Sequence, residues 1–189
     1  MALSKIQAES MNLADTYAFT GTVSGASDYV KITETVLSND ATYVSFTSSG
    51  SPNIFSSDYK KLHFYFSNWN VTKTTTSFVA MHSENNTIAQ SNYDTNYDLA
   101  QSTSDQEICQ NVYTGNDESV SGIVKLYNPS STTYVKHFIS NTQSYFASSR
   151  SWHNLVAGYC NTTSAINGVI FRFDTNNMDD GTIQMFGVK

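Results

Sequence analysis

The chain has 189 residues, a length that suits a single β domain with one core. Its net charge is -6 and it has only 10 Lys and Arg, scattered along the sequence, which argues against nucleic acid or an anionic membrane as a partner. Charged residues make up 14% and hydrophobic residues 39%, with 12 Tyr and 11 Phe. Many of the apolar residues are therefore aromatic residues that favour β-strands. No stretch approaches the roughly 18 apolar residues of a membrane span.

Residues 1–25 differ from the rest and are predicted to be an N-terminal assembly arm. Ser4 and Gln7 fit a helix capping box, and either a short helix or an extended arm is compatible with the pattern. An apolar arm this short cannot bury itself, so we expect it to lie against a neighbouring surface. Its expected contact residues are Leu3, Ile6, Met11, Leu13, Tyr17 and Phe19. Residues 1–7 also lack the apolar core of a secretory signal, so we expect synthesis in a cytoplasm.

Residues 26–189 are predicted to form one β domain, because apolar residues alternate with polar ones. The clearest strand has Leu62, Phe64 and Phe66 on one face and His63 and Tyr65 on the other. Further strands are expected within 29–37, 44–46, 78–81, 120–126, 135–139, 152–160, 166–173 and 183–188. Turns are expected at 38–40 and 128–131, and the polar segment 83–110 is expected to be a loop. About ten short strands without βαβ alternation predict an antiparallel β-sandwich, jelly-roll-like, preceded by the arm.

No catalytic constellation is found, so the chain is predicted not to be an enzyme. It contains no nucleophile elbow, phosphate-binding loop or dinucleotide fingerprint. Its four histidines lie in expected strands, where they satisfy core hydrogen bonds or face solvent. The carboxylate clusters at 116–118 and 179–181 are interpreted as turns, the second because Asp-Gly favours a tight turn. No cofactor is expected.

Two sequence patterns are candidate metal sites, and neither fits the requirements of one. Residues 94–105 begin like a calcium loop, but Leu99 occupies the position that needs Gly, so a solvated loop is the preferred interpretation. Cys109 and Cys160 are the only cysteines, too few and too far apart for a structural zinc site. We expect both to be small core or near-surface residues rather than a disulfide.

Aromatic side chains in loops are candidate contacts for sugar rings. Trp69 follows a strand in the segment Asn68–Asn70 and is expected to be exposed, whereas Trp152 lies within a strand and is expected to be buried. Tyr93 and Tyr97 lie in the expected loop. The possible glycan contacts are therefore Trp69, Tyr93 and Tyr97.

Two parts of the chain resemble virion proteins of tailed bacteriophages, especially marine or cyanophage-like ones. The first comprises 3–7 and 12–23, which contains AFTGTV, and is similar to the leader of tail-fibre or appendage proteins. The second comprises 122–129, 165–173 and 181–189, and resembles their C-terminal β domain. Residues 83–110 match nothing in that group.

The resemblance implies a non-enzymatic structural protein of the virion, from a tail fibre or appendage or from the capsid surface. Its arm would dock on other virion proteins of the capsid or tail, and its β domain would face outward. We expect a homotrimer. The alternative is a carbohydrate-binding adhesin or receptor-binding module that contacts a host surface glycan, and a polysaccharide-degrading spike is least favoured because no carboxylate pair stands out.

Overall fold

The computed structural model describes residues 28–48, 54–70, 77–83, 88–92, 99–102, 106–112, 118–146, 150–173 and 177–189. These residues form strands and their connections, without a helix among them. The predicted all-β class is confirmed, and so is antiparallel pairing, which joins every pair of neighbouring strands. The predicted assembly arm, residues 1–25, lies outside the described residues.

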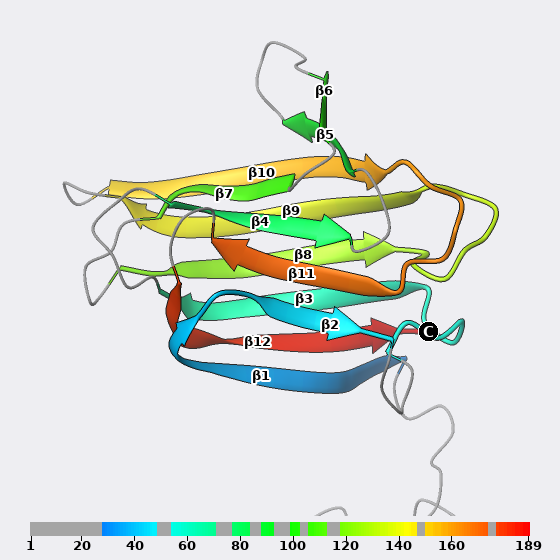
Figure 1. The fold of residues 1–189 in the computed structure, drawn as a ribbon, viewed down its shortest axis with the longest axis horizontal. Coiled ribbons are helices and arrows are strands. Elements are labelled where there is room, and N and C mark those ends of the chain that lie inside the picture. Colours follow the sequence, from blue (N-terminus) through cyan, green and yellow to red (C-terminus); the bar gives the residue numbers. More distant parts are fainter. Residues whose placement is uncertain are drawn as a thin grey trace, which may run out of the picture.

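The strands form two sheets (Figure 1). The strands are β1 (Tyr29–Ala41), β2 (Val44–Thr47), β3 (Lys61–Trp69), β4 (Ser77–Ser83), β5 (Ile88–Asn92), β6 (Leu99–Ser102), β7 (Gln106–Val112), β8 (Val120–Tyr127), β9 (Lys136–Phe146), β10 (Arg150–Cys160), β11 (Gly168–Phe173) and β12 (Met178–Val188). The large sheet has eight strands in the order β1-β12-β3-β8-β9-β10-β5-β6, and the small sheet has four in the order β2-β11-β4-β7. In Figure 1 the small sheet lies across one face of the large one.

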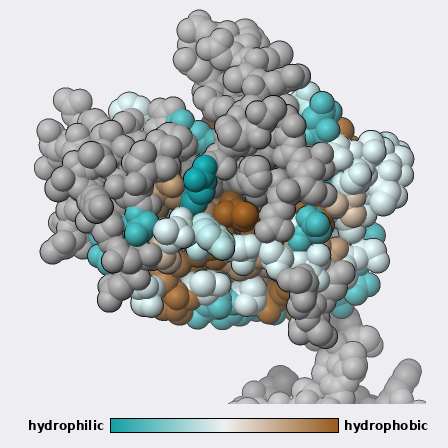
Figure 2. Space-filling model, viewed as in Figure 1, coloured by the Kyte–Doolittle hydropathy of each residue, from teal (hydrophilic) through white to brown (hydrophobic). Residues whose placement is uncertain are grey.

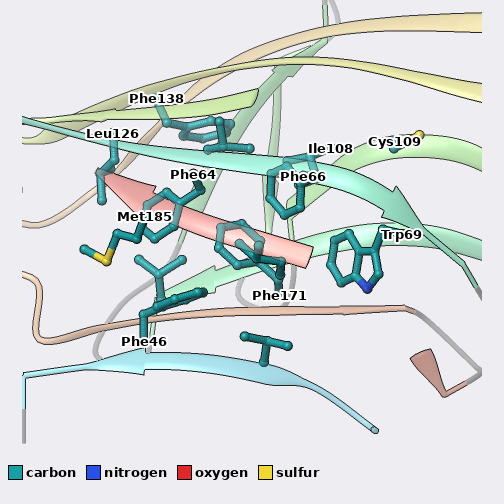
Figure 3. Packing of buried hydrophobic residues seen from close by; sticks show 14 of the residues in the cluster. Phe46, Phe64, Phe66, Trp69, Ile108, Cys109, Leu126, Phe138, Phe171 and Met185 are labelled. Atoms are coloured by element: carbon teal, nitrogen blue, oxygen red, sulfur yellow. The ribbon is translucent and has the colours of Figure 1, made fainter. Parts of the chain in front are cut away.

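Side chains from the two sheets meet in one apolar core (Figure 3). The predicted alternation of β3 places Leu62, Phe64 and Phe66 in this core, each at most 3% exposed. The Phe64 ring contacts two rings of the small sheet, Phe46 at 5.3 Å and Phe171 at 5.1 Å between centroids. Burying a side chain of this size stabilises a fold by roughly 1.5–3 kcal/mol, so these rings hold the sheets together.

Two expected irregular segments form strands. The predicted turn at 38–40 lies inside β1, where Ser38 pairs with Asp180 and Ala41 with Met178 across a register shift. The predicted loop 83–110 contains β5, β6 and most of β7. Both predictions were wrong for one reason: polar residues with weak strand propensity join a sheet when a neighbouring strand satisfies their backbone groups. The turn expected at 128–131 is confirmed by the hydrogen bond from Ser131 N to Asn128 O.

The Asp-Gly pair at 180–181 lies within β12 instead of forming the predicted turn. Gly181 has φ +124°, and a Cβ atom there would lie 2.7 Å from the Cα of Trp69. Asp179 N donates to Asn70 O, and Asn70 N donates to Asp180 O, both at 3.0 Å. Glycine is therefore used here for close approach of β12 to the end of β3.

The described residues that are visible over the small sheet are mainly polar. In Figure 2 most described residues on this face are hydrophilic or neutral, and hydrophobic ones appear in small separate areas. Surface apolar residues spaced in this way are ordinary in folded proteins. A candidate binding surface lies instead on the opposite, outward face of the large sheet.

Candidate binding site

Trp69 is not an exposed glycan contact, which corrects the sequence-based prediction. Its side chain is 0% exposed and lies parallel to Phe66, with centroids 5.1 Å apart. The register shifts between Phe66 and Trp69, and Asn68 has φ 53°. Regular alternation from Phe66 would turn residue 69 outward; this bulge turns it into the core instead.

Trp152 departs from its prediction in the opposite direction. It lies in β10 as expected but is 39% exposed. On its face of the strand, Asn154 and Val156 are buried, so the buried part of this face begins two residues after Trp152. Tyr93 and Tyr97, the other predicted glycan contacts, and the arm residues Leu3 to Phe19 lie outside the described residues, and their roles stay predictions.

The outward face of the large sheet carries a group of aromatic and cationic side chains, which we call the aromatic–lysine patch. It consists of Tyr29, Lys61, His63, Tyr65, Lys125 and Phe186. Since Leu62 and Phe64 point into the core, residues 61, 63 and 65 of β3 point outward. His63 is paired with Phe186 of β12 on one side and Lys125 of β8 on the other. The patch thus extends across β1, β12, β3 and β8.

The aromatic members hold each other in fixed positions. Tyr29 stacks on Phe186 with centroids 4.9 Å apart, and Tyr65 meets the same ring edge-on at 5.5 Å. The Tyr29 hydroxyl donates to the Tyr65 hydroxyl at 2.7 Å and lies 3.0 Å from Nδ1 of His63. With the Tyr29 hydroxyl donating to Tyr65, the His63 tautomer that carries its proton on Nδ1 is the one that donates to Tyr29. These contacts immobilise Tyr29, which is still 37% exposed.

The charges around His63 are positive. Burial lowers the pKa of His63, and the Lys125 and Lys61 ammonium groups lower it further. Its Nε2 atom is buried without a hydrogen-bond partner in the described structure. Burial, together with the hydrogen bond to Tyr65, raises the pKa of the Tyr29 phenol, so it stays neutral. The patch therefore places a neutral imidazole between two cations.

The cations in and beside the patch differ in their partners. Lys31, on neighbouring β1, donates to Glu34 at 2.6 Å, and Gln184 donates to the same carboxylate oxygen at 2.6 Å. These contacts lower the pKa of Glu34. Among the described residues Lys61 and Lys125 have no carboxylate partner, and Lys61 Nζ lies 5.7 Å from the centroid of the Tyr127 ring. The patch has free positive charge on its β3–β8 side only.

A buried lysine inside the domain has a structural role. Lys136 is 0% exposed, and its ammonium donates to the backbone carbonyls of Thr162 at 3.2 Å and Ser164. Burial lowers the pKa of Lys136, and neighbouring Cys160 opposes that shift. The ammonium holds the connection between β10 and β11. The sequence did not predict this burial, because an alternating strand pattern assigns a lysine to the solvent-facing side.

Both cysteines are buried and not disulfide-bonded, which confirms their prediction as core residues. Burial raises the pKa of the Cys109 thiol to about 11. A thiol that stays protonated at neutral pH is a poor nucleophile. Cys109 therefore adds no reactive centre to the domain.

Within the described ranges, no three His, Cys, Asp or Glu side chains gather in a way that could hold a metal ion. The same part of the chain contains no helix long and apolar enough to cross a membrane. Comparisons with known proteins find no matching family model, no matching curated protein and no matching solved structure. The candidate site therefore rests on geometry alone.

Part of this patch could be predicted from the sequence. Alternation in 62–67 placed His63 and Tyr65 together on a polar face, but Tyr29 and Phe186 lie at opposite ends of the chain. Pairing of β1 with β12, and of β12 with β3, brings those ends to His63. Only the sheet order could place them in one site.

Proposed function

We propose that the chain is a non-enzymatic, jelly-roll structural domain of a virus particle. The supporting observation is strand order. Without the hairpins β5–β6 and β9–β10, the sheets are β1-β12-β3-β8 and β2-β11-β4-β7, and the first strand pairs with the last. In this reduced order each strand lies in the sheet opposite to the strand before it, except where β7 follows β4. This order supports a jelly roll, a fold used by viral capsid and lectin domains.

In this proposal residues 1–25 dock on a capsid or tail protein, and the β domain faces outward as part of a tail fibre, appendage or capsid surface. The domain assembles as a homotrimer. Large apolar side chains available for subunit contact include Val36 at 66% exposed and Tyr134 at 69%. The low content of charged residues also suits a surface built for contact.

Purified particles test the structural role. Particles formed in cells that produce the chain should contain it in a fixed copy number by quantitative mass spectrometry. Electron microscopy with a specific antibody should locate it on the capsid or tail. Particles that lack the chain after density-gradient purification would contradict the proposal.

Light scattering on the purified chain tests the assembly state. At micromolar concentration we expect a mass three times the 20.9 kDa of one chain. Removing residues 1–25 should block incorporation into particles. A compact monomer that still enters particles without its arm would argue against the arm as the docking element.

A second candidate function is carbohydrate binding, as an adhesin or receptor-binding module. The observation that favours it is the aromatic–lysine patch, because an immobilised, part-exposed ring such as Tyr29 offers a flat surface to a sugar ring at low entropic cost. Binding of the isolated chain to a glycan array would support this function. Failure to bind any glycan on a broad array would remove it and leave the structural role untouched.

A further inference from the structure

The aromatic–lysine patch has a local charge opposite to that of the whole chain. The chain carries 16 Asp and Glu against 10 Lys and Arg, yet Lys61 and Lys125 flank His63 without a carboxylate partner among the described residues. An unpaired cation beside a partly buried ring is less screened than one surrounded by water. This part of an acidic protein therefore favours an anionic group.

The net charge also differs from one side of the patch to the other. Glu34 lies beside the β1 edge, held by Lys31 and Gln184, whereas the unpaired lysines lie on β3 and β8. The Lys31–Glu34 pair on β1 has no net charge, so an anion is attracted mainly to the β3–β8 side. Phe186 on β12 lies between β1 and β3, and the Tyr29 ring stacks on it, so a ligand that rests on the Tyr29 ring would point its acidic group toward Lys61 and Lys125.

A twofold contact with a second copy of the chain fits this face poorly. A twofold contact would place the same surface of both subunits together, and Lys61 and Lys125 would face the same lysines. Like charges brought together in this way oppose association. Two unpaired lysines are also few for a nucleic acid, whose binding draws on many phosphate contacts.

We propose that the aromatic–lysine patch binds an acidic saccharide, with a sugar ring against Tyr29 and a carboxylate or sulfate at Lys61 and Lys125. The proposal deepens the carbohydrate-binding function and rests on it, but it does not depend on where the chain lies in a particle. Uronic acids and sulfated sugars share the required chemistry. The site takes either source of negative charge together with the apolar face of a sugar ring.

Titration calorimetry on the full chain tests the ligand class. The probes are trigalacturonate, a heparin-derived tetrasaccharide, and neutral maltotriose. We expect both acidic probes or one of them to bind, maltotriose to bind more weakly, and affinity for the acidic probe to fall as salt rises. Which acidic probe binds more tightly identifies the source of the charge. Equal binding of maltotriose would overturn the proposal.

Single substitutions test the site. Lys61→Gln and Lys125→Gln should each weaken binding of the acidic probe by about two- to fivefold, and Tyr29→Ala by roughly two- to tenfold. Arg172→Gln removes the same charge from an exposed position on β11 of the small sheet, and its affinity should equal that of the unchanged chain. Far-UV circular dichroism confirms that each variant is folded.

Three results would overturn the site. One is absence of binding to both acidic probes at millimolar concentration. Another is acidic-glycan binding that survives all three patch variants, which would leave carbohydrate binding standing but place it elsewhere. The third is self-association that is lost in the patch variants, since it would make the patch a contact between subunits.

Discussion

Asn68 decides the direction of its neighbour Trp69. Its positive φ and the register shift beside it carry the indole into a cluster with Phe66, Phe171 and Phe173. The indole N–H is buried there without a partner in the described structure, which offsets part of the gain from burial. Trp69 is therefore a packing residue with one unsatisfied group.

Trp69→Ala should lower the free energy of unfolding by about 3–5 kcal/mol, because it empties a large volume between the sheets. Trp152→Ala is the matched control, since Trp152 is 39% exposed, and should cost less than about 1 kcal/mol. Urea unfolding followed by circular dichroism measures both. A larger loss for Trp152 would contradict the assignment of Trp69 to the core.

His63 should make the stability of the domain depend on pH. The ordinary pKa is 6.5, and burial with Lys125 and Lys61 lowers it in the folded state. The unfolded chain then binds a proton at higher pH than the folded chain does, so the free energy of unfolding decreases as pH falls below about 6.5. Above that pH the imidazole is neutral in both states and the contribution is fully present.

His63→Gln should remove this part of the pH dependence, since Gln keeps a donor for Tyr29 but does not titrate. The measurement is the difference in unfolding free energy between pH 7.5 and pH 5 for the original chain and the variant. The groups that face His63 are Tyr29, Tyr65, Lys61 and Lys125, and none has an ordinary pKa in this window. An unchanged difference would show that His63 is not the responsible group.

At the scale of elements, the inward face of β9 is polar from Ser140 to Ser144. Ser140, Thr142 and Ser144 are buried there. Thr142 Oγ1 donates to Ile108 O of β7 at 2.8 Å, and Ser140 Oγ contacts the same carbonyl at 3.4 Å. Because β7 is the last strand of the small sheet, side-chain hydroxyls supply backbone partners that the sheet does not.

Thr142→Val should destabilise β7 more than the rest of the domain. The change preserves the shape of the side chain but leaves the Ile108 carbonyl without its best donor, at a cost of about 1–3 kcal/mol. Hydrogen exchange should quicken in 106–112, with a smaller change in β3. Thr133→Val, at an exposed position, is the control. Equal exchange in both variants would contradict a supporting role for β9.

This face of β9 also explains why the sequence pattern predicted only the first part of the strand. The prediction ended the strand at Ile139, whereas β9 continues to Phe146. Alternation of Ser and Thr with Asn and Gln carries no apolar signal, although it is the same two-residue period. A polar strand becomes recognisable only once the strand that accepts its hydroxyls is known.

At the scale of the whole molecule, residues 1–25 and 26–189 are predicted to act separately. The first strand of the large sheet begins at Tyr29, so removal of residues 1–25 should leave the β-sheet circular dichroism spectrum intact and shift the melting temperature by no more than a few degrees. Thermal unfolding of the two chains measures this. A large loss of stability would show that the arm belongs to the fold of its own subunit.

The sequence alone determined the β class, most strand positions and the inward direction of residues such as Leu62, Phe64 and Phe66, because a two-residue period is a local property of the chain. The tertiary structure decided which strands are neighbours. It turned Trp69 inward, buried Lys136, and joined Tyr29 to Phe186. Each of these depends on groups far apart in the sequence, whose contacts form only when β12 pairs with β1 and β3.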